Sequence, residues 1–476
     1  MTVMLTLARR KLLAARARHR LLLSLRSVRA APTPPSFGVM SPHLDDPVVV
    51  DGSMLEGGGQ IVRVAAALAA ATGRETTVRS IRAGRPKPGL AAQHLAGLDM
   101  CRRACGGSFV GGDPTVGSTS VTLRPGSAAA AAAAAADHSD GEASWRSDVG
   151  TAGAVSLVAQ AAVPALVFGG RPARLRITGG TDVAMAPPVG YLAHVLAPIL
   201  RAHLGVRVTV ETLRRGYFPR GGGVVVARVA ASATEDTQNP NPTFPLPPIR
   251  LERPRARRGG DAEPAKLACW VVNPRAAGRS DHHEESRAVA VAALREALSR
   301  SPTLAVAAEA MAAAGVPVDC RTATEEGDGD GGSVVVVATS PDDRVALAAS
   351  ATLDPPRGGF PSESARRDAF VALGTRTGAE LAEIVESGAA VDDRLLDQLV
   401  VFMALAGKGK GSAGEGGEKS RVVARWPISE HARAAMATCE AVTGAKFDVR
   451  VGQEGGVEEG LCAVECVGCG AEPRQR

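Results

Sequence analysis

The chain from Asp51 to Arg63 reads DGSMLEGGGQIVR, and these residues give the strongest indication of the fold. Three glycines stand directly before a helical pattern that begins at Gln60, so the backbone can turn sharply and approach a ligand closely. Such a turn leaves N–H groups at a helix N-terminus, where anions bind. Glu56 opposes a bare phosphate but suits a metal ion that rides on one. A structural turn with a capping glutamate is the alternative interpretation.

Beyond this turn, helical and strand-like patterns alternate along the chain. This alternation predicts an α/β fold with helices packed on sheets. Glycine-rich turns recur at 179–180 and 221–223, which indicates a repeated unit. The helical patterns cover 60–72, 90–104, 155–162, 189–204, 285–299, 304–314, 365–387, 395–406 and 429–443. The strand-like runs cover 76–81, 118–123, 175–178, 206–211, 224–229, 333–338, 345–350 and 447–451.

Changes in composition divide the chain into domains. A different composition begins near Arg250 and ends near Leu353, so we predict a smaller inserted α/β domain at 250–353 within a main domain at 45–245 and 355–470. Two low-complexity segments are predicted to be loops. They are 127–146, which contains nine consecutive alanines, and the Gly/Lys/Ser-rich 407–420.

Three cations fall in a predicted turn between a strand and a helix. Arg82, Arg85 and Lys87 lie within six residues of one another, and glycine and proline residues fix the turn around them. The guanidinium fork of an arginine matches the oxygens of a phosphate, so the cluster predicts an oxyanion clamp. A solvated basic turn has equal support from these residues alone.

Two later blocks complete the pattern. Residues 215–225 read RGYFPRGGGVV, and a glycine triplet that leads into a strand usually marks a bulge or close backbone packing. Asp397 opens an apolar helix, while His431 follows a proline turn and opens the next helix. A lone histidine is more often structural, but near a carboxylate it can act as a nucleophile or general base.

Together these blocks resemble the RNA 3′-terminal phosphate cyclase family. The match runs in order from about residue 49 to residue 468, through the blocks EGGGQxxR, SIRAGRxxPGLxxQH, GGTDxxxAPP, RGxxPxGGG and DQLxxxMALAG. The resemblance implies three repeated βαβαββ units with helices packed on four-stranded sheets, plus the smaller inserted α/β domain. It also implies an ATP-dependent enzyme of the ligase or nucleotidyltransferase type.

The implied reaction has three steps. A histidine attacks the α-phosphate of ATP to give a histidyl–AMP intermediate and pyrophosphate. AMP then passes to an RNA 3′-phosphate, and the neighbouring 2′-OH closes a 2′,3′-cyclic phosphate and expels AMP. The expected partners are therefore ATP, an RNA with a 3′-phosphate end and a divalent metal, Mg²⁺ or Mn²⁺, without any membrane.

The resemblance also assigns roles to residues. His431 matches the nucleophile, Asp397 matches an acid expected to orient its ring, and Glu56 matches the metal-binding carboxylate. The matching nucleotide-binding positions are Gly57, Gly58, Gly59, Arg63, Gln93, Gln160 and Pro187, and those for the substrate phosphate are Arg82, Arg85 and Lys87. Two positions depart from the pattern, since Arg394 replaces a tyrosine common near the nucleotide and Glu430 directly precedes the histidine.

Two other classes of protein share part of this sequence pattern. The first alternative is a non-catalytic relative that acts as a binding factor in pre-rRNA processing and ribosome biogenesis. The inactive branch typically loses the GGGQ turn, the arginine pair and the histidine, all of which this chain keeps. An enolpyruvyl transferase shares only the general plan.

The positive charge of the chain is confined to its leader. The whole chain carries +6, but residues 1–39 hold eight Lys and Arg and no acid, which leaves 47 basic and 49 acidic residues in the remainder. Such a leader is typical of a transit peptide to the mitochondrion or plastid. If Met40 is the true start, we expect the nucleus or cytoplasm, as for the family. A basic RNA-binding arm is the third interpretation.

Overall fold

The computed structural model describes residues 47–55, 57–137, 142–230, 244–253, 266–272, 282–300, 319–323, 327–328, 331–340, 342–354, 356, 359–407 and 419–473. The leader, Glu56, the helix predicted at 304–314 and most of the 407–420 segment lie outside these residues. Within them, no helix has the length and apolar character that crossing a membrane requires. The mixed α/β fold class predicted from the sequence is confirmed.

The first sheet surrounds the glycine turn. Its strands follow the order β1-β2-β4-β3, with β1 and β2 parallel and the other neighbours antiparallel. Alternate residues of β1 and β2 are buried, so one face of the sheet is covered by helices. The elements are β1 (Val48–Asp51), α2 (Gly59–Thr72), β2 (Thr76–Arg79), α3 (Ala92–Ala104), β3 (Ser108–Phe109) and β4 (Val121–Arg124).

The second sheet repeats this strand order in its centre. Its inner strands run β6-β7-β9-β8, again with one parallel pair followed by two antiparallel pairs. Short strands β5 (Ala136–Asp137) and β13 (Gly327–Asp328) extend its two edges. The other elements are β6 (Ala143–Asp148), α5 (Val155–Val167), β7 (Ala173–Gly179), α6 (Val189–Tyr191), η1 (Leu192–Leu196), α7 (Ala197–Leu204), β8 (Arg207–Gly216) and β9 (Gly223–Ala230).

The third sheet has the order β10-β16-β18-β17 and the same strand directions. Strands β10 and β16 are neighbours in space, although the inserted domain separates them in the sequence. The elements are β10 (Arg250–Leu251), α11 (Asp393–Leu405), β16 (Ser420–Arg425), α12 (Glu430–Thr443), β17 (Lys446–Val451), η2 (Gly452–Gly455) and β18 (Leu461–Val467).

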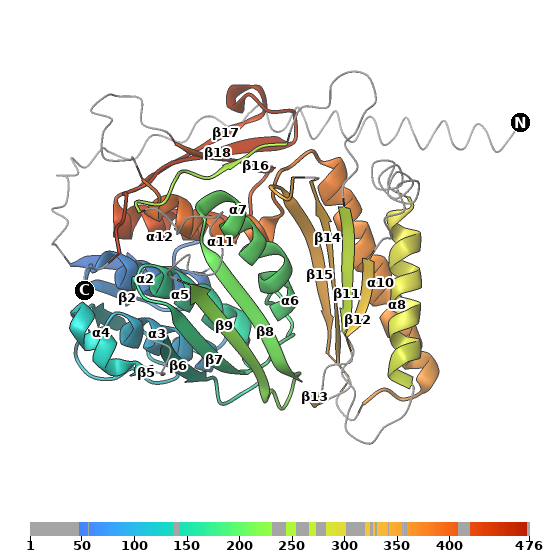
Figure 1. Ribbon diagram of the computed structural model, residues 1–476, viewed down its shortest axis with the longest axis horizontal. Coiled ribbons are helices and arrows are strands. Elements are labelled where there is room, and N and C mark those ends of the chain that lie inside the picture. The colour runs from blue at the N-terminus through green and yellow to red at the C-terminus, as the bar shows by residue number, and fades with distance from the viewer. Residues whose placement is uncertain are drawn as a thin grey trace, which may run out of the picture. The chain divides into compact units, whose positions relative to one another are not determined.

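The inserted segment forms a fourth sheet of its own, in the order β12-β11-β14-β15. Helices α8 and α10 lie side by side against it, as Figure 1 shows in yellow and orange. The sequence places α10 in the main domain, yet it packs on the insert, where Gly374 faces the Ala290 carbonyl too closely for any larger side chain. The elements are β11 (Lys266–Val272), α8 (His282–Leu298), β12 (Asp319–Ala323), β14 (Gly332–Thr339), β15 (Ala346–Leu353) and α10 (Glu363–Glu386).

The predicted alanine loop at 127–146 is wrong for most of its length. Residues Ala128–Ala134 form helix α4, and β5 and β6 follow it. Alanine has the highest helix propensity, and Ser127 caps the helix by accepting the Ala130 N–H at 3.1 Å. Low complexity therefore marks a regular element here.

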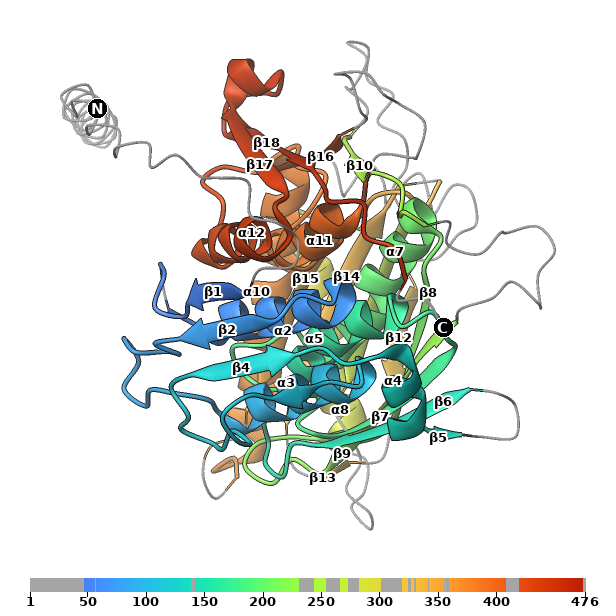
Figure 2. The ribbon, with the colours of Figure 1, turned by 90° about the vertical axis from the view of Figure 1, so that its left-hand side faces the viewer.

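The helices of the three sheets pack on one another. Helix α2 contacts α5 and α12, and α11 contacts α12. Figure 2 shows α2 below α11 and α12 and above α3. Helix α2 is rich in alanine and almost fully buried, which allows neighbouring helices to approach closely. The glycine turn, Arg63, Asp397 and His431 lie at or near the N-terminal ends of these central helices, whereas Gln160 lies in the middle of α5.

Candidate active site

The glycine triplet forms the turn that the sequence predicts. Gly57 adopts a left-handed backbone with φ of +55°, and Gly58 is the N-cap of α2. At Gly59 a β-carbon would lie 2.0 Å from Nε2 of His94, so only glycine fits there. Neither an acidic residue in the first turn nor a side-chain cap occupies this helix end among the described residues.

One turn into α2, two polar side chains are buried together. Arg63 donates a hydrogen bond to Oε1 of Gln60, and Nε2 of Gln60 lies 3.4 Å from the Asp397 carbonyl oxygen. The two residues are three positions apart in α2 and so lie on a similar face of the helix. The contact also ties the first block of the chain to α11.

A small cavity lies between the first helices of the three sheet units. Its volume is about 20 Å³, which is room for one water molecule. Gln60 and Arg63 of α2, Gln160 of α5 and Asp397 of α11 line it. Three predicted site residues, Arg63, Gln160 and Asp397, therefore meet from three distant parts of the sequence. The half-buried Pro187 lies outside this lining.

Asp397 is a partly buried carboxylate with an unusual pKa. Burial raises its pKa to about 7, and the charge of Asp393 acts in the same direction. A hydrogen bond from Ser429 and the charge of Arg63 oppose the shift without cancelling it. The carboxyl group is therefore poised to change its charge near neutral pH.

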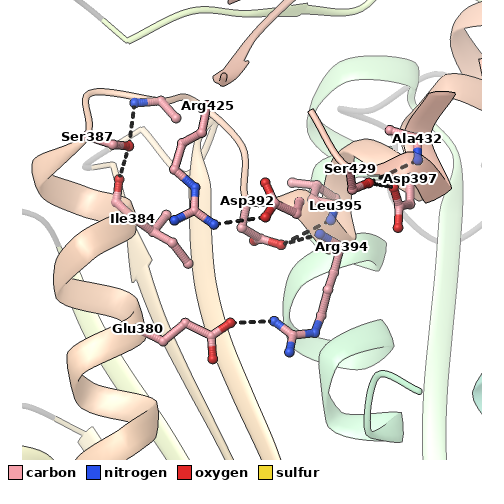
Figure 3. A network of polar contacts seen from close by, with 12 residues as sticks. Glu380, Ile384, Ser387, Asp392, Arg394, Leu395, Asp397, Arg425, Ser429 and Ala432 are labelled. Atoms are coloured by element: carbon pink, nitrogen blue, oxygen red, sulfur yellow. Dashed lines mark hydrogen bonds and ion pairs between the residues drawn. The ribbon is translucent and has the colours of Figure 1, made fainter. Parts of the chain in front are cut away.

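Ser429 connects Asp397 to the helix that carries His431. Its hydroxyl donates to Oδ1 of Asp397 at 3.0 Å and accepts the Ala432 N–H at 3.0 Å, which makes it the N-cap of α12 (Figure 3). His431 is the second residue of that helix and is exposed, and Glu430 before it is exposed as well. The sequence missed Ser429, whose only signal is a serine directly before a helical pattern.

The cationic turn is present, but its members differ in environment. Arg82 has a positive φ of 51° and donates from Nη1 to the Gly89 carbonyl at 2.8 Å. Partial burial and the nearby charge of Arg85 lower the pKa of Arg82. Arg85 is half-buried, whereas Lys87 is exposed. Arg82 and Arg85 thus form a close pair, while Lys87 faces solvent.

The first turn of α3 reaches toward the start of α5. Oε1 of Gln93 accepts the Ala154 N–H at 3.0 Å, directly before α5 begins. His94 follows it, buried against Gly59. The predicted site residue Gln93 therefore holds two helix starts together.

The GGTD and RG blocks meet in a buried ion pair. Nη1 of Arg215 lies 2.9 Å from Oδ2 of Asp182, and both side chains are almost fully buried. Thr181 also donates to Oδ2 of Asp182 at 2.7 Å. Beyond them, Gly221 sits too close to the Thr151 carbonyl for a side chain, which confirms the predicted close backbone packing.

Arg394, a departure from the family pattern, faces the insert. Its Nη1 lies 2.7 Å from Oε1 of Glu380 on α10, and its Nη2 donates to the Ser350 carbonyl at 3.3 Å (Figure 3). The guanidinium thus links α11 to the inserted domain.

Comparisons with known proteins agree on one family. Residues 54–449 match the family described as RNA 3′-terminal phosphate cyclase. Proteins of that name from Nitrosospira multiformis and Thermococcus kodakarensis are each 34% identical, over 75% and 76% of this chain and 83% and 86% of their own lengths. A namesake from Archaeoglobus fulgidus is 43% identical over 37% of this chain, a match that spans 50% of that relative.

Proposed function

Because the chain belongs to the RNA 3′-terminal phosphate cyclase family, we propose that it converts RNA 3′-terminal phosphates to 2′,3′-cyclic phosphates at the expense of ATP. A phosphate monoester is a poor electrophile, and adenylylation gives it a leaving group. The proposal covers the ATP dependence, the histidyl–AMP intermediate and the residues that form it.

One observation carries most of the proposal. Arg63 and Asp397 line the same small cavity, and Asp397 is joined through Ser429 to the helix start that bears His431. The ends of adjacent helices thus hold three groups: the guanidinium of Arg63 for a phosphate, the titratable carboxyl of Asp397 and the exposed imidazole of His431. This set of groups suits transfer of a nucleotidyl group through a nucleophilic histidine.

In the proposed first step, an imidazole nitrogen of His431 attacks the α-phosphorus of ATP. A P–N bond forms and the bond to pyrophosphate breaks. The exposure of His431 on the first turn of α12 leaves its ring accessible to a nucleotide from solvent. Arg63, and the N–H groups at the start of α2, offset the charge that builds up on the phosphate oxygens.

In the second and third steps, the RNA end displaces the histidine from AMP and then cyclises. An oxygen of the RNA 3′-phosphate attacks the α-phosphorus, the P–N bond breaks and the imidazole is released. The ribose 2′-OH then attacks the RNA phosphorus and AMP leaves. Arg82 and Arg85 are assigned to the RNA phosphate, because they form a close cationic pair on a turn beside the site.

A divalent metal is part of the proposal. No group of three His, Cys, Asp or Glu side chains that could hold a metal occurs within the described ranges. Magnesium commonly uses only one or two carboxylates together with substrate phosphates, so Glu56 beside the glycine turn remains the proposed ligand. The ion would neutralise charge on the bound phosphates.

The proposal is tested with ATP labelled at the α-phosphate. Wild-type protein with Mg²⁺ or Mn²⁺ should acquire an acid-labile, base-stable label, and His431→Ala should not. Added RNA with a 3′-phosphate should then discharge the label and gain a cyclic end, whereas the same RNA with a 3′-OH should not. Wild-type labelling no greater than that of His431→Ala would refute the enzyme and favour the non-catalytic binding factor.

A further inference from the structure

His94 is a buried histidine whose protonation is fixed by its surroundings. It lies in the first turn of α3, with 5% of its surface exposed. Its Nδ1 accepts the Ala91 N–H at 3.1 Å, so a neutral ring carries its proton on Nε2. Burial first, and then the charges of Arg63 and Arg82, lower the pKa of His94 to about 3. The ring is therefore a neutral donor throughout the physiological range.

The donor atom is the ring atom nearest to the start of α2. A β-carbon at Gly59 would lie 2.0 Å from Nε2 but 2.7 and 2.8 Å from the two adjoining ring carbons, so the Nε2 corner faces Gly59. Nε2 has no hydrogen-bond partner in the described part of the chain. On a side chain that is only 5% exposed, a donor without an acceptor is open to a ligand that supplies one.

The surroundings select an anion for that ligand. The N–H groups at the start of α2 and the guanidinium groups of Arg63 and Arg82 all favour negative charge. A metal cation would be repelled by the arginines and would find a proton on Nε2. A neutral ring also adds a donor without adding a third positive charge.

We propose that His94 is a phosphate-binding residue, whose Nε2–H donates to an oxygen of a phosphate held at the N-terminus of α2. This inference rests on the proposed function, because ATP and the RNA 3′ end are the two sources of such a phosphate. It gives a role to a histidine that the sequence interpretation left without one.

The test compares two substitutions of His94. His94→Phe keeps an aromatic ring and removes the donor, whereas His94→Gln keeps an N–H donor. The matched control is His203→Phe, because His203 is another histidine whose ring is hydrogen-bonded to the backbone, at the carbonyl oxygen of Arg344. Thermal unfolding confirms that each protein is folded before binding is measured.

Two measurements separate the sources of phosphate. One is the rate of protein–AMP formation at low ATP without RNA, and the other is the affinity for an RNA oligonucleotide ending in 3′-phosphate relative to 3′-OH. His94→Phe should lower at least one of them by roughly tenfold to a hundredfold, the range for a lost hydrogen bond to a charged group, while His94→Gln should keep most of it. Loss in the first assigns the phosphate of ATP, and loss in the second assigns the RNA phosphate.

The proposal is overturned if folded His94→Phe matches wild type and His203→Phe in both measurements. Ring ¹⁵N spectra of ¹⁵N-histidine wild type give a readout without substitution. The Nε2 signal of the non-titrating ring should move with ATP or the 3′-phosphate RNA and stay fixed with adenosine and the 3′-OH RNA; no movement with any of them also overturns it. If wild type forms no protein–AMP, the proposed function fails. The RNA affinity and the ring spectra still test whether His94 binds a phosphate.

Discussion

The Ser429 hydroxyl lies 3.0 Å from Oδ1 of Asp397, and the same hydroxyl caps α12. A serine has one proton to donate, and here it is committed to the carboxylate. Its lone pairs remain for the Ala432 N–H, so both partners are satisfied at once. One side chain therefore joins the partly buried acid to the start of the histidine-bearing helix.

Ser429→Ala removes both contacts. We expect a loss of about 1 kcal/mol in the free energy of unfolding, which is typical for a lost N-cap, and slower protein–AMP formation. Ser429→Thr keeps the hydroxyl and should restore both. Urea unfolding and single-turnover labelling measure the two effects. An alanine variant as fast and as stable as wild type would show that the link has no role.

The raised pKa of Asp397 predicts that the free energy of unfolding depends on pH. Its pKa is raised to about 7 from the ordinary 3.8, so the folded protein holds this proton more tightly than the unfolded chain does. Its contribution is greatest below about pH 4 and is lost as the pH rises toward 7. Asp397→Asn keeps a neutral side chain at every pH, so it should match wild type at pH 4 and be relatively more stable at pH 8. The shift allows up to about 4 kcal/mol.

Urea unfolding of the two proteins at pH 4, 6 and 8 checks this. The difference in the free energy of unfolding between Asp397→Asn and wild type should grow as the pH rises through 7 and then level off. A difference that stays constant with pH would mean that Asp397 is already ionised in the folded protein at pH 4.

Much of the site could be predicted because its residues lie in short, distinctive blocks. The glycine turn and the helix from Gln60 follow from local pattern alone. The meeting of Arg63 with Gln160 and Asp397 does not, because it depends on how α2, α5 and α11 pack. Only the family resemblance suggested that these residues share a site.

What could not be predicted follows from packing as well. Helix α10 has an ordinary helical pattern, and nothing local says that its glycines face α8 rather than the main domain. Strands β16 (SRVVAR) and β18 (LCAVECV) were missed, because the apolar run of the first is only three residues long and the second does not alternate clearly between apolar and polar residues. Ser429 was missed because one polar residue before a helix is common.

The buried pair of Arg215 and Asp182 should be important for stability. Arg215→Met leaves the carboxylate of Asp182, which has 0% exposure, without its charged partner. We therefore expect a loss of roughly 3–5 kcal/mol in the free energy of unfolding. The double variant with Asp182→Asn removes both charges and should recover much of the loss. Arg300→Met is the control, because its pair with Glu296 is largely exposed and should change stability little. Equal losses from the two arginine variants would contradict the prediction.

Gly59 is predicted to tolerate no side chain because of His94. In Gly59→Ala the new β-carbon would overlap Nε2 of a buried ring, and we expect a cost of about 1–3 kcal/mol in the free energy of unfolding. Gly84→Ala is the matched control, since no atom lies within 4 Å of its β-carbon position. The cost at Gly59 should shrink strongly in a His94→Ala background, because the two residues compete for one space. Thermal and urea unfolding of the four proteins measure this coupling, and additive costs would place the strain somewhere other than the imidazole.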